Sequence, residues 1–162
     1  MPERVSFERQ AVDRLLVALE GIPDTVVFRG MGPANRLAIT GWDLPEARHF
    51  QFGDLRVEGP SSTVVVEIES AGGVTNLVKY WPLLAAGRPA KRFVMVHLFR
   101  VTSANDYASH HRLWEYLVDR MREDLAGRCQ LRWPEDWEAR MFRYARIEDI
   151  DQVADFVRKA LS

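Results

Sequence analysis

The sequence has a single cysteine, Cys129, and no continuous apolar run of the roughly 18 residues that a membrane-spanning helix requires. One cysteine excludes an internal disulfide and suits a reducing cytoplasm. The first residues, Met1 to Arg4, are polar and charged and lack the apolar centre of a secretion signal. We therefore expect a cytoplasmic protein that is neither secreted nor inserted into a membrane.

The sequence also lacks an excess of charge of either sign. Its formal net charge is −1, so any surface that binds DNA must be a local cluster of arginines. Lysine is scarce and occurs only at positions 79, 91 and 159. With 162 residues, 47% of them hydrophobic, and no internal repeat or linker, residues 1–162 are expected to form a single domain with a sizeable core.

Residues 54–69 predict an antiparallel hairpin. A β-prone run from Thr63 to Glu69 follows the turn residues Gly59 to Ser62, and a shorter strand from Asp54 to Glu58 precedes them. A turn at this position places Asp54 opposite Glu67, although like charges at opposed positions are destabilising. The same register gives four further opposed pairs, namely Leu55 with Val66, Arg56 with Val65, Val57 with Val64 and Glu58 with Thr63.

The predicted hairpin gathers carboxylates on one face. Because side chains alternate along a strand, Glu67 and Glu69 share a face, while the valines and Ile68 between them point to the other side. A hard divalent cation such as Mg²⁺ would explain three acids in one patch, since it prefers oxygen ligands. The alternative is an exposed sheet face on which Arg56 neutralises the acids as ordinary surface ion pairs.

A helix is expected after the glycines at 72 and 73. Asn76, Lys79, Tyr80 and Leu83 fall on one stripe of this helix, and Pro82 should kink or end it. A helix that leaves the end of the acidic strand can bring Lys79 back over the carboxylates, where an ammonium group orients water or stabilises a phosphoryl transition state. The alternative is a solvated surface lysine.

These residues resemble the PD-(D/E)XK nuclease superfamily, which has the restriction-endonuclease-like fold. Its signature is an acid at the start of one hairpin strand, an acidic-x-Lys element on the next strand and a following helix. Asp54 matches the first acid and Glu67 the second, whereas Glu69 stands at the usual lysine position. Some members carry Glu-x-Glu there and others move the lysine into the helix, as Lys79 would be. Gly53 stands where the family has proline.

The resemblance implies a metal-dependent endonuclease that hydrolyses phosphodiester bonds of DNA with Mg²⁺ or Mn²⁺. Asp54, Glu67 and Glu69 would be the metal ligands, and Glu69 and Lys79 the catalytic residues, with Glu69 completing the site or accepting a proton from water. A helix precedes the hairpin in the family and sometimes adds an acid to the site. Glu8, in the amphipathic helix expected over residues 6–20, is the best candidate for that acid, with an ordinary surface helix as the alternative.

The remaining pattern predicts an α/β or α+β domain with a central mixed sheet flanked by helices and a restriction-endonuclease-like core. The apolar run at 92–99 is typical of a strand buried on both faces that pairs in parallel after a crossover. Further elements are expected as short strands at 25–29, 36–40, 49–52, 129–133 and 141–147 and as helices at 104–126 and 149–161.

Several alternatives stay open from the sequence. Asp43 rivals Asp54 as the first acid, and His97 is either a hydrogen-bonded core histidine or a residue facing the metal. His111 and Glu115, one helical turn apart, are expected on the surface because two ligands make no metal site. The chain is then a nuclease, an inert binding or scaffolding module of the same fold in a homodimer or larger nucleic-acid-processing or defence assembly, or an unrelated domain with an accidental acidic hairpin.

Overall fold

The computed structural model describes residues 6–70 and 73–162, so Met1 to Arg4 and Gly72 lie outside it. None of the helices in these two ranges has both the length and the apolar composition needed to cross a membrane. The helices and strands are α1 (Phe7–Leu19), β1 (Val26–Arg29), β2 (Arg36–Leu37), β3 (Phe50–Gln51), β4 (Leu55–Glu58), β5 (Ser62–Glu69), α2 (Thr75–Val78), α3 (Tyr80–Ala85), β6 (Arg92–Arg100), α4 (Ala108–Cys129), β7 (Trp137–Tyr144) and α5 (Ile150–Leu161).

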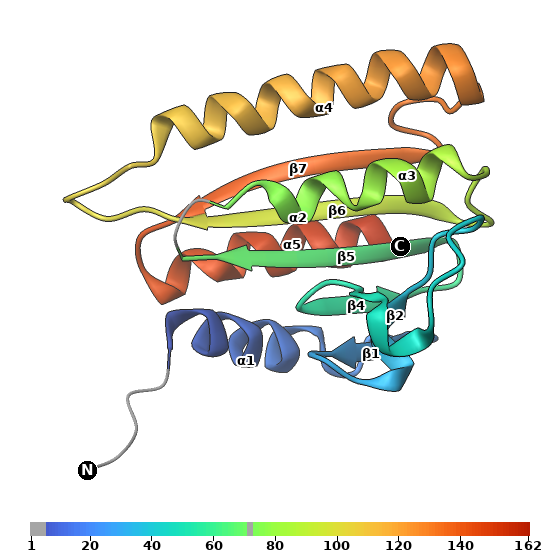
Figure 1. The fold of residues 1–162 in the computed structure, drawn as a ribbon. Helices are drawn as coiled ribbons and strands as arrows, with labels where there is room; N and C mark the ends of the chain where they lie inside the picture. The colour runs from blue at the N-terminus through green and yellow to red at the C-terminus, as the bar shows by residue number, and fades with distance from the viewer. Residues whose placement is uncertain (1–5, 71–72) are drawn as a thin grey trace.

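The centre of the fold is a mixed sheet of five strands in the order β1-β4-β5-β6-β7 (Figure 1). β1, β4 and β5 pair in antiparallel fashion, whereas β5, β6 and β7 are parallel. The two short strands β2 and β3 form a separate pair beside β4. The predicted α+β class and the central mixed sheet flanked by helices are therefore confirmed.

Helices cover both faces of the sheet. α1 and α5 pack on one face, where Val64, Val66 and Ile68 of β5 are buried with their apolar stripes. α2, α3 and α4 pack on the other face, and α4 runs above β6 and β7 (Figure 1). The predicted apolar face of β5, with Val64, Val66 and Ile68, is therefore confirmed.

The predicted hairpin register is confirmed for the four pairs from Leu55–Val66 to Glu58–Thr63. The ladder ends there, so Asp54 is not paired with Glu67 as a ladder residue. Its backbone N–H donates instead to Val66 O at 2.9 Å. The preceding Gly53 has a positive φ of 78°, which redirects the chain at this point.

Of two strands predicted near the C-terminus, one is absent and the other has different bounds. The strand expected at 129–133 does not exist, because α4 continues to Cys129 and Gln130 then adopts a left-handed conformation. Residues 132–136 form a turn in which Arg132 N donates to Asp136 Oδ2 at 2.8 Å. The next strand begins at Trp137 rather than at Met141, since Trp137 is fully buried and pairs with Phe93.

Candidate functional site

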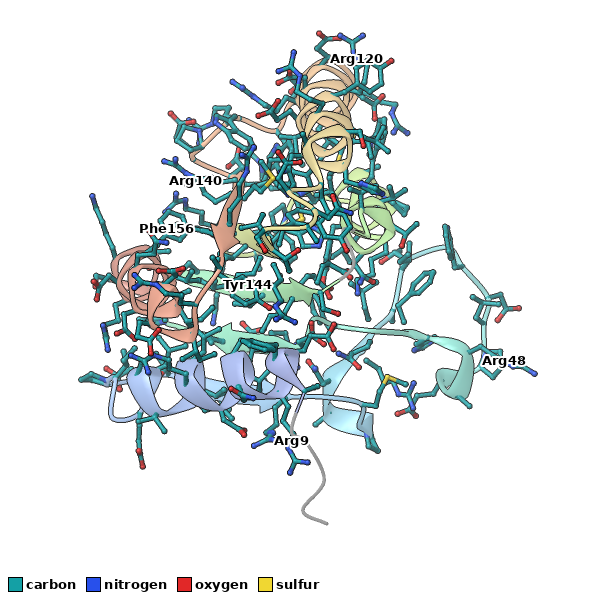
Figure 2. All side chains as sticks on the ribbon, turned by 90° about the vertical axis from the view of Figure 1, so that its left-hand side faces the viewer. Arg9, Arg48, Arg120, Arg140, Tyr144 and Phe156 are labelled. Carbon is teal, nitrogen blue, oxygen red and sulfur yellow. The ribbon has the colours of Figure 1, made fainter. Side chains whose placement is uncertain are left out.

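The predicted acids lie at the carboxyl end of β5, on the face that α2, α3 and α4 cover. Glu67 and Glu69 share this face with the buried Val65. The carboxyl ends of β5 and β6 point toward the viewer in Figure 2, where Tyr144 at the end of β7 lies near the centre. The shared face that alternation predicted for the two glutamates is therefore confirmed.

Glu67 forms a buried ion pair with Lys79. The Lys79 Nζ lies 2.5 Å from Glu67 Oε1, and the Tyr80 hydroxyl donates to the same oxygen. Glu67 is 4% exposed and Lys79 8% exposed. The alternative of a solvated surface lysine is therefore wrong, and the predicted approach of Lys79 to the acidic strand is confirmed.

A break between α2 and α3 places Lys79 in this position. Proline lacks a backbone N–H and clashes with the carbonyl four residues earlier, so Pro82 disrupts the helix near Val78. α2 ends at Val78 and α3 begins at Tyr80. The Tyr80 ring packs against Phe93 with ring centroids 5.7 Å apart, which fixes the second helix on the sheet. Lys79, at the junction, is directed onto Glu67.

Asp54 closes the open end of the hairpin through its side chain. Its Oδ2 accepts a hydrogen bond from Ile68 N at 2.8 Å, and its Oδ1 accepts one from Gln51 Nε2 at 3.2 Å. Asp54 thereby lies beside the strand that carries both glutamates. Gln51, the last residue of β3, lies only three residues before Asp54, but no motif in the sequence singled it out as a partner of this carboxylate.

Burial controls the charge of these acids. Desolvation raises the pKa of Glu67 from its ordinary 4.5 to about 7, although Lys79 and Tyr80 act in the opposite direction. The pKa of Asp54 is also raised by burial, while the N–H of Ile68 counteracts the shift. Asp54 and Glu67 repel each other's negative charge, as expected for neighbouring carboxylates. Burial and mutual repulsion therefore both favour the protonated form of these two acids.

Glu69 has its own set of polar neighbours. Its Oε1 accepts a hydrogen bond from Asn76 Nδ2 at 2.5 Å and lies 3.6 Å from His97 Nε2. The His97 ring is 2% exposed, and its Nδ1 accepts a hydrogen bond from Trp114 Nε1 at 3.1 Å. The alternative of a hydrogen-bonded core histidine is therefore confirmed, and Nε2 of the same ring faces Glu69.

Glu8 reaches the same strand end from the other face of the sheet. Its Oε1 accepts hydrogen bonds from the Ser70 hydroxyl at 2.5 Å and from Ser70 N at 3.2 Å. Glu8 is half-buried in this contact. Ser70 follows Glu69 directly, which places four acids around the end of one strand.

The other candidates lie elsewhere. Arg56 pairs with Glu58 at 3.3 Å and not with the acids of the site, and Asp43 is exposed in a turn. His111 was predicted on the surface, which is wrong, because it is 1% exposed beneath the start of α4. Glu115 pairs with Arg112 on the outside of that helix. In Figure 2, Arg9, Arg48 and Arg120 lie on three different outer sides of the molecule.

The oxygen donors suit a magnesium-type site of few protein ligands. No group of three or more His, Cys, Asp or Glu side chains is arranged to hold one metal ion within residues 6–70 and 73–162. Mg²⁺, however, commonly binds through one or two carboxylates and completes its shell with water and phosphate oxygens. The carboxylates of Asp54 and Glu67, with Glu69 on the same face, fit that pattern of donors.

Comparisons of the chain with protein-family models, with curated proteins and with solved structures found no match in any of the three. A function for the chain is therefore inferred from the chemistry of these residues.

The raised pKa of Glu67 predicts a pH dependence of stability. Between pH 4.5 and about 7 the folded protein keeps a proton on Glu67 that the unfolded chain releases, so the free energy of unfolding falls as pH rises through this window. The fall from this group amounts to about 3 kcal/mol at most. Urea denaturation at pH 5 and at pH 7.5 measures this fall. The free energy of unfolding should decrease less between the two pH values for Glu67→Gln than for the parent protein.

The matched control for this titration is Glu115→Gln, which removes an exposed carboxylate of α4 that pairs only with its neighbour Arg112. The free energy of unfolding of this variant should decrease between the two pH values by the same amount as that of the parent. An identical decrease in the parent and in Glu67→Gln would contradict the raised pKa of Glu67.

Proposed function

We propose that the chain is a metal-dependent nuclease or nuclease-like domain that acts on DNA phosphodiester bonds, with a restriction-endonuclease-like core of the PD-(D/E)XK type. The observation that carries the proposal is the 2.5 Å contact of Lys79 Nζ with Glu67, at the strand end where Asp54 and Glu69 also lie. An ammonium group in a cluster of carboxylates provides the charges that phosphoryl transfer requires.

The order of the elements supports the proposal. An N-terminal helix precedes the hairpin, Asp54 directly precedes its first strand, and Glu67 and Glu69 stand on the second. A broken helix carrying Lys79 and a parallel strand follow. Glu8, from the helix, lies within hydrogen-bonding distance of Ser70 at the same strand end. These are the features that the sequence resemblance implies.

Each residue has a role under this proposal. Asp54 and Glu67 would hold Mg²⁺ or Mn²⁺, with Glu69 beside them. When bound, such an ion neutralises charge on the phosphate and lowers the pKa of water. Lys79 would orient the attacking water or stabilise the negative charge that develops on the phosphate. Glu69, whose Oε1 is held by Asn76, would accept the proton of that water.

Binding of Mn²⁺, followed by electron paramagnetic resonance of the free ion, tests this assignment. The parent should bind Mn²⁺, and Asp54→Asn should weaken the affinity at least about tenfold, because the variant loses one of few anionic ligands. Asp43→Asn, a change in the exposed turn, is the matched control and should bind as the parent does. Equal affinities of the parent and Asp54→Asn would contradict the proposed ligand set.

A catalytically inert module of the same fold is the second candidate. Its support is that Glu67 Oε1 already has two partners, Lys79 and Tyr80, and lies in a buried position. Such a module would bind DNA or a protein partner, as a homodimer or within a larger assembly in the cytoplasm. Binding of Mn²⁺ and DNA by the parent without cleavage would favour this function.

A further inference from the structure

A continuous chain of polar contacts connects α4 to the proposed catalytic lysine. It begins with Trp114, whose Nε1 donates to His97 Nδ1 at 3.1 Å. His97 Nε2 faces Glu69 Oε1 at 3.6 Å. Asn76 then donates to that same oxygen at 2.5 Å and accepts from Lys79 Nζ at 3.5 Å. None of these contacts involves residues that are adjacent in the sequence.

The indole of Trp114 determines which nitrogen of His97 carries a proton. An indole N–H can only donate, so the His97 Nδ1 that receives its hydrogen bond must be unprotonated. The neutral ring then carries its hydrogen on Nε2. Nε2 is buried and has no hydrogen-bond partner within the described residues, and Glu69 Oε1 is the acceptor that it faces. The ring also packs on Phe99 with ring centroids 4.4 Å apart, which limits its rotation.

The distance from His97 to Glu69 shows what kind of contact they form. At 3.6 Å it exceeds a normal hydrogen bond, so in this structure the N–H exerts an electrostatic pull on the carboxylate. Asn76 donates a hydrogen bond to the same oxygen. Both neighbours act on Glu69 Oε1, so Oε2 is the oxygen left for chemistry.

We infer that His97 and Trp114 are positioning residues of the candidate site: Trp114 fixes the Nε2–H tautomer of His97, and His97 together with Asn76 orients Glu69 and, through Asn76, Lys79. The inference rests on the proposed function, because it assigns these residues to the orientation of the groups that would hydrolyse the phosphodiester. It adds two residues, one in β6 and one in α4, that lie outside the hairpin motif.

Histidine ring ¹⁵N NMR of the parent tests the tautomer without reference to any activity. His97 should show an unprotonated Nδ1 and a protonated Nε2, and Trp114→Phe should yield a mixture of the two tautomers, since phenylalanine keeps an aromatic ring but has no N–H. A proton on Nδ1 of His97 in the parent would overturn the inference. So would a ring in Trp114→Phe that keeps the parent's single tautomer.

Kinetics separates positioning from packing. His97→Leu fills the site without an N–H donor and should lower kcat for Mn²⁺-dependent DNA cleavage by about 10–100-fold, with KM changed by less than about threefold. His97→Gln can present an amide N–H near the position of Nε2 and should regain most of kcat. Equal losses of kcat in the two variants, with thermal unfolding unchanged in both, would overturn the positioning role.

The NMR and kinetic experiments also distinguish a failure of this inference from a failure of the proposed function. If the parent does not cleave DNA, the proposed function fails, and NMR still decides the tautomer. Crystal structures of the parent and His97→Leu then decide the positioning: Glu69 and Asn76 should rotate away from their parent positions in the variant. Unchanged positions of both side chains would overturn it.

Discussion

Lys79→Met should abolish DNA cleavage almost completely while the fold is retained. Lys79 forms the ion pair with Glu67, whereas Lys91 donates to Gly59 O at the turn end of the hairpin. Removing a preorganised charged group that stabilises the transition state typically costs about 100–1000-fold in rate. Single-turnover cleavage of plasmid DNA in Mn²⁺ measures this loss. Methionine keeps much of the length of the side chain, so the effect reports the charge.

The stability of Lys79→Met should fall less than a broken buried ion pair implies. Loss of one partner of such a pair typically costs about 3–5 kcal/mol. Lys79 is the group that most lowers the pKa of Glu67, so without it Glu67 stays protonated at neutral pH and no unpaired charge remains. We expect a loss below about 3 kcal/mol by urea denaturation. Tyr80 still contacts the carboxyl group.

Lys91→Met is the matched control for the cleavage measurement. It removes a lysine that also contacts the hairpin, but at the opposite end of the sheet from the acids. Its cleavage rate should stay within about threefold of the parent. Lys79→Met cleaving as fast as Lys91→Met would exclude Lys79 from the chemistry.

Gly53→Ala should destabilise the fold by about 2–5 kcal/mol. Gly53 has a φ of 78°, a conformation that costs an alanine roughly 1–2 kcal/mol. An added Cβ would lie 2.7 Å from Val65 Cγ1 and 2.8 Å from the Leu55 carbonyl oxygen. The backbone cannot move freely there, so overpacking adds about 1–3 kcal/mol. Urea denaturation of the variant measures the sum of both effects.

The same substitution should also disturb the candidate site. Gly53 directly precedes Asp54, and its carbonyl accepts a hydrogen bond from Gln51 Nε2 at 2.8 Å. Gly87→Ala is the control, since a Cβ at Gly87 meets nothing within 4 Å and its φ is not positive. That variant should be as stable as the parent or slightly more stable. Equal stabilities of the two alanine variants would contradict the account of Gly53.

Local patterns in the sequence were sufficient for most of the fold. Alternation along residues 63–69 predicted the faces of β5, and the turn residues predicted a register that the structure has in all four ladder pairs. Boundaries were less predictable. Residues 129–133 have strand-like composition, but α4 extends to Cys129 because its apolar stripe continues through Leu125 onto the sheet. The helix ends where Gln130 adopts a left-handed conformation, which no residue type in this stretch indicated.

Some residues of the candidate site could be predicted from the sequence, and others could not. Asp54, Glu67 and Glu69 follow from spacing within one hairpin, and Lys79 follows from the helical stripe after it. No sequence pattern paired Trp114 with His97, because Trp114 belongs to α4 and His97 to β6, and they meet only through packing. His111 was expected on the surface, but the structure buries it on the sheet-facing side of α4.

Cleavage of supercoiled plasmid and of single-stranded DNA by the purified protein, with Mn²⁺ and with EDTA in its place, tests the central proposal most directly. We predict cleavage of DNA in Mn²⁺, none in EDTA, and none by Glu67→Ala in either condition. Cleavage that persists in EDTA, or that Glu67→Ala performs as well as the parent, would contradict the assignment of a metal-dependent site to the end of β5.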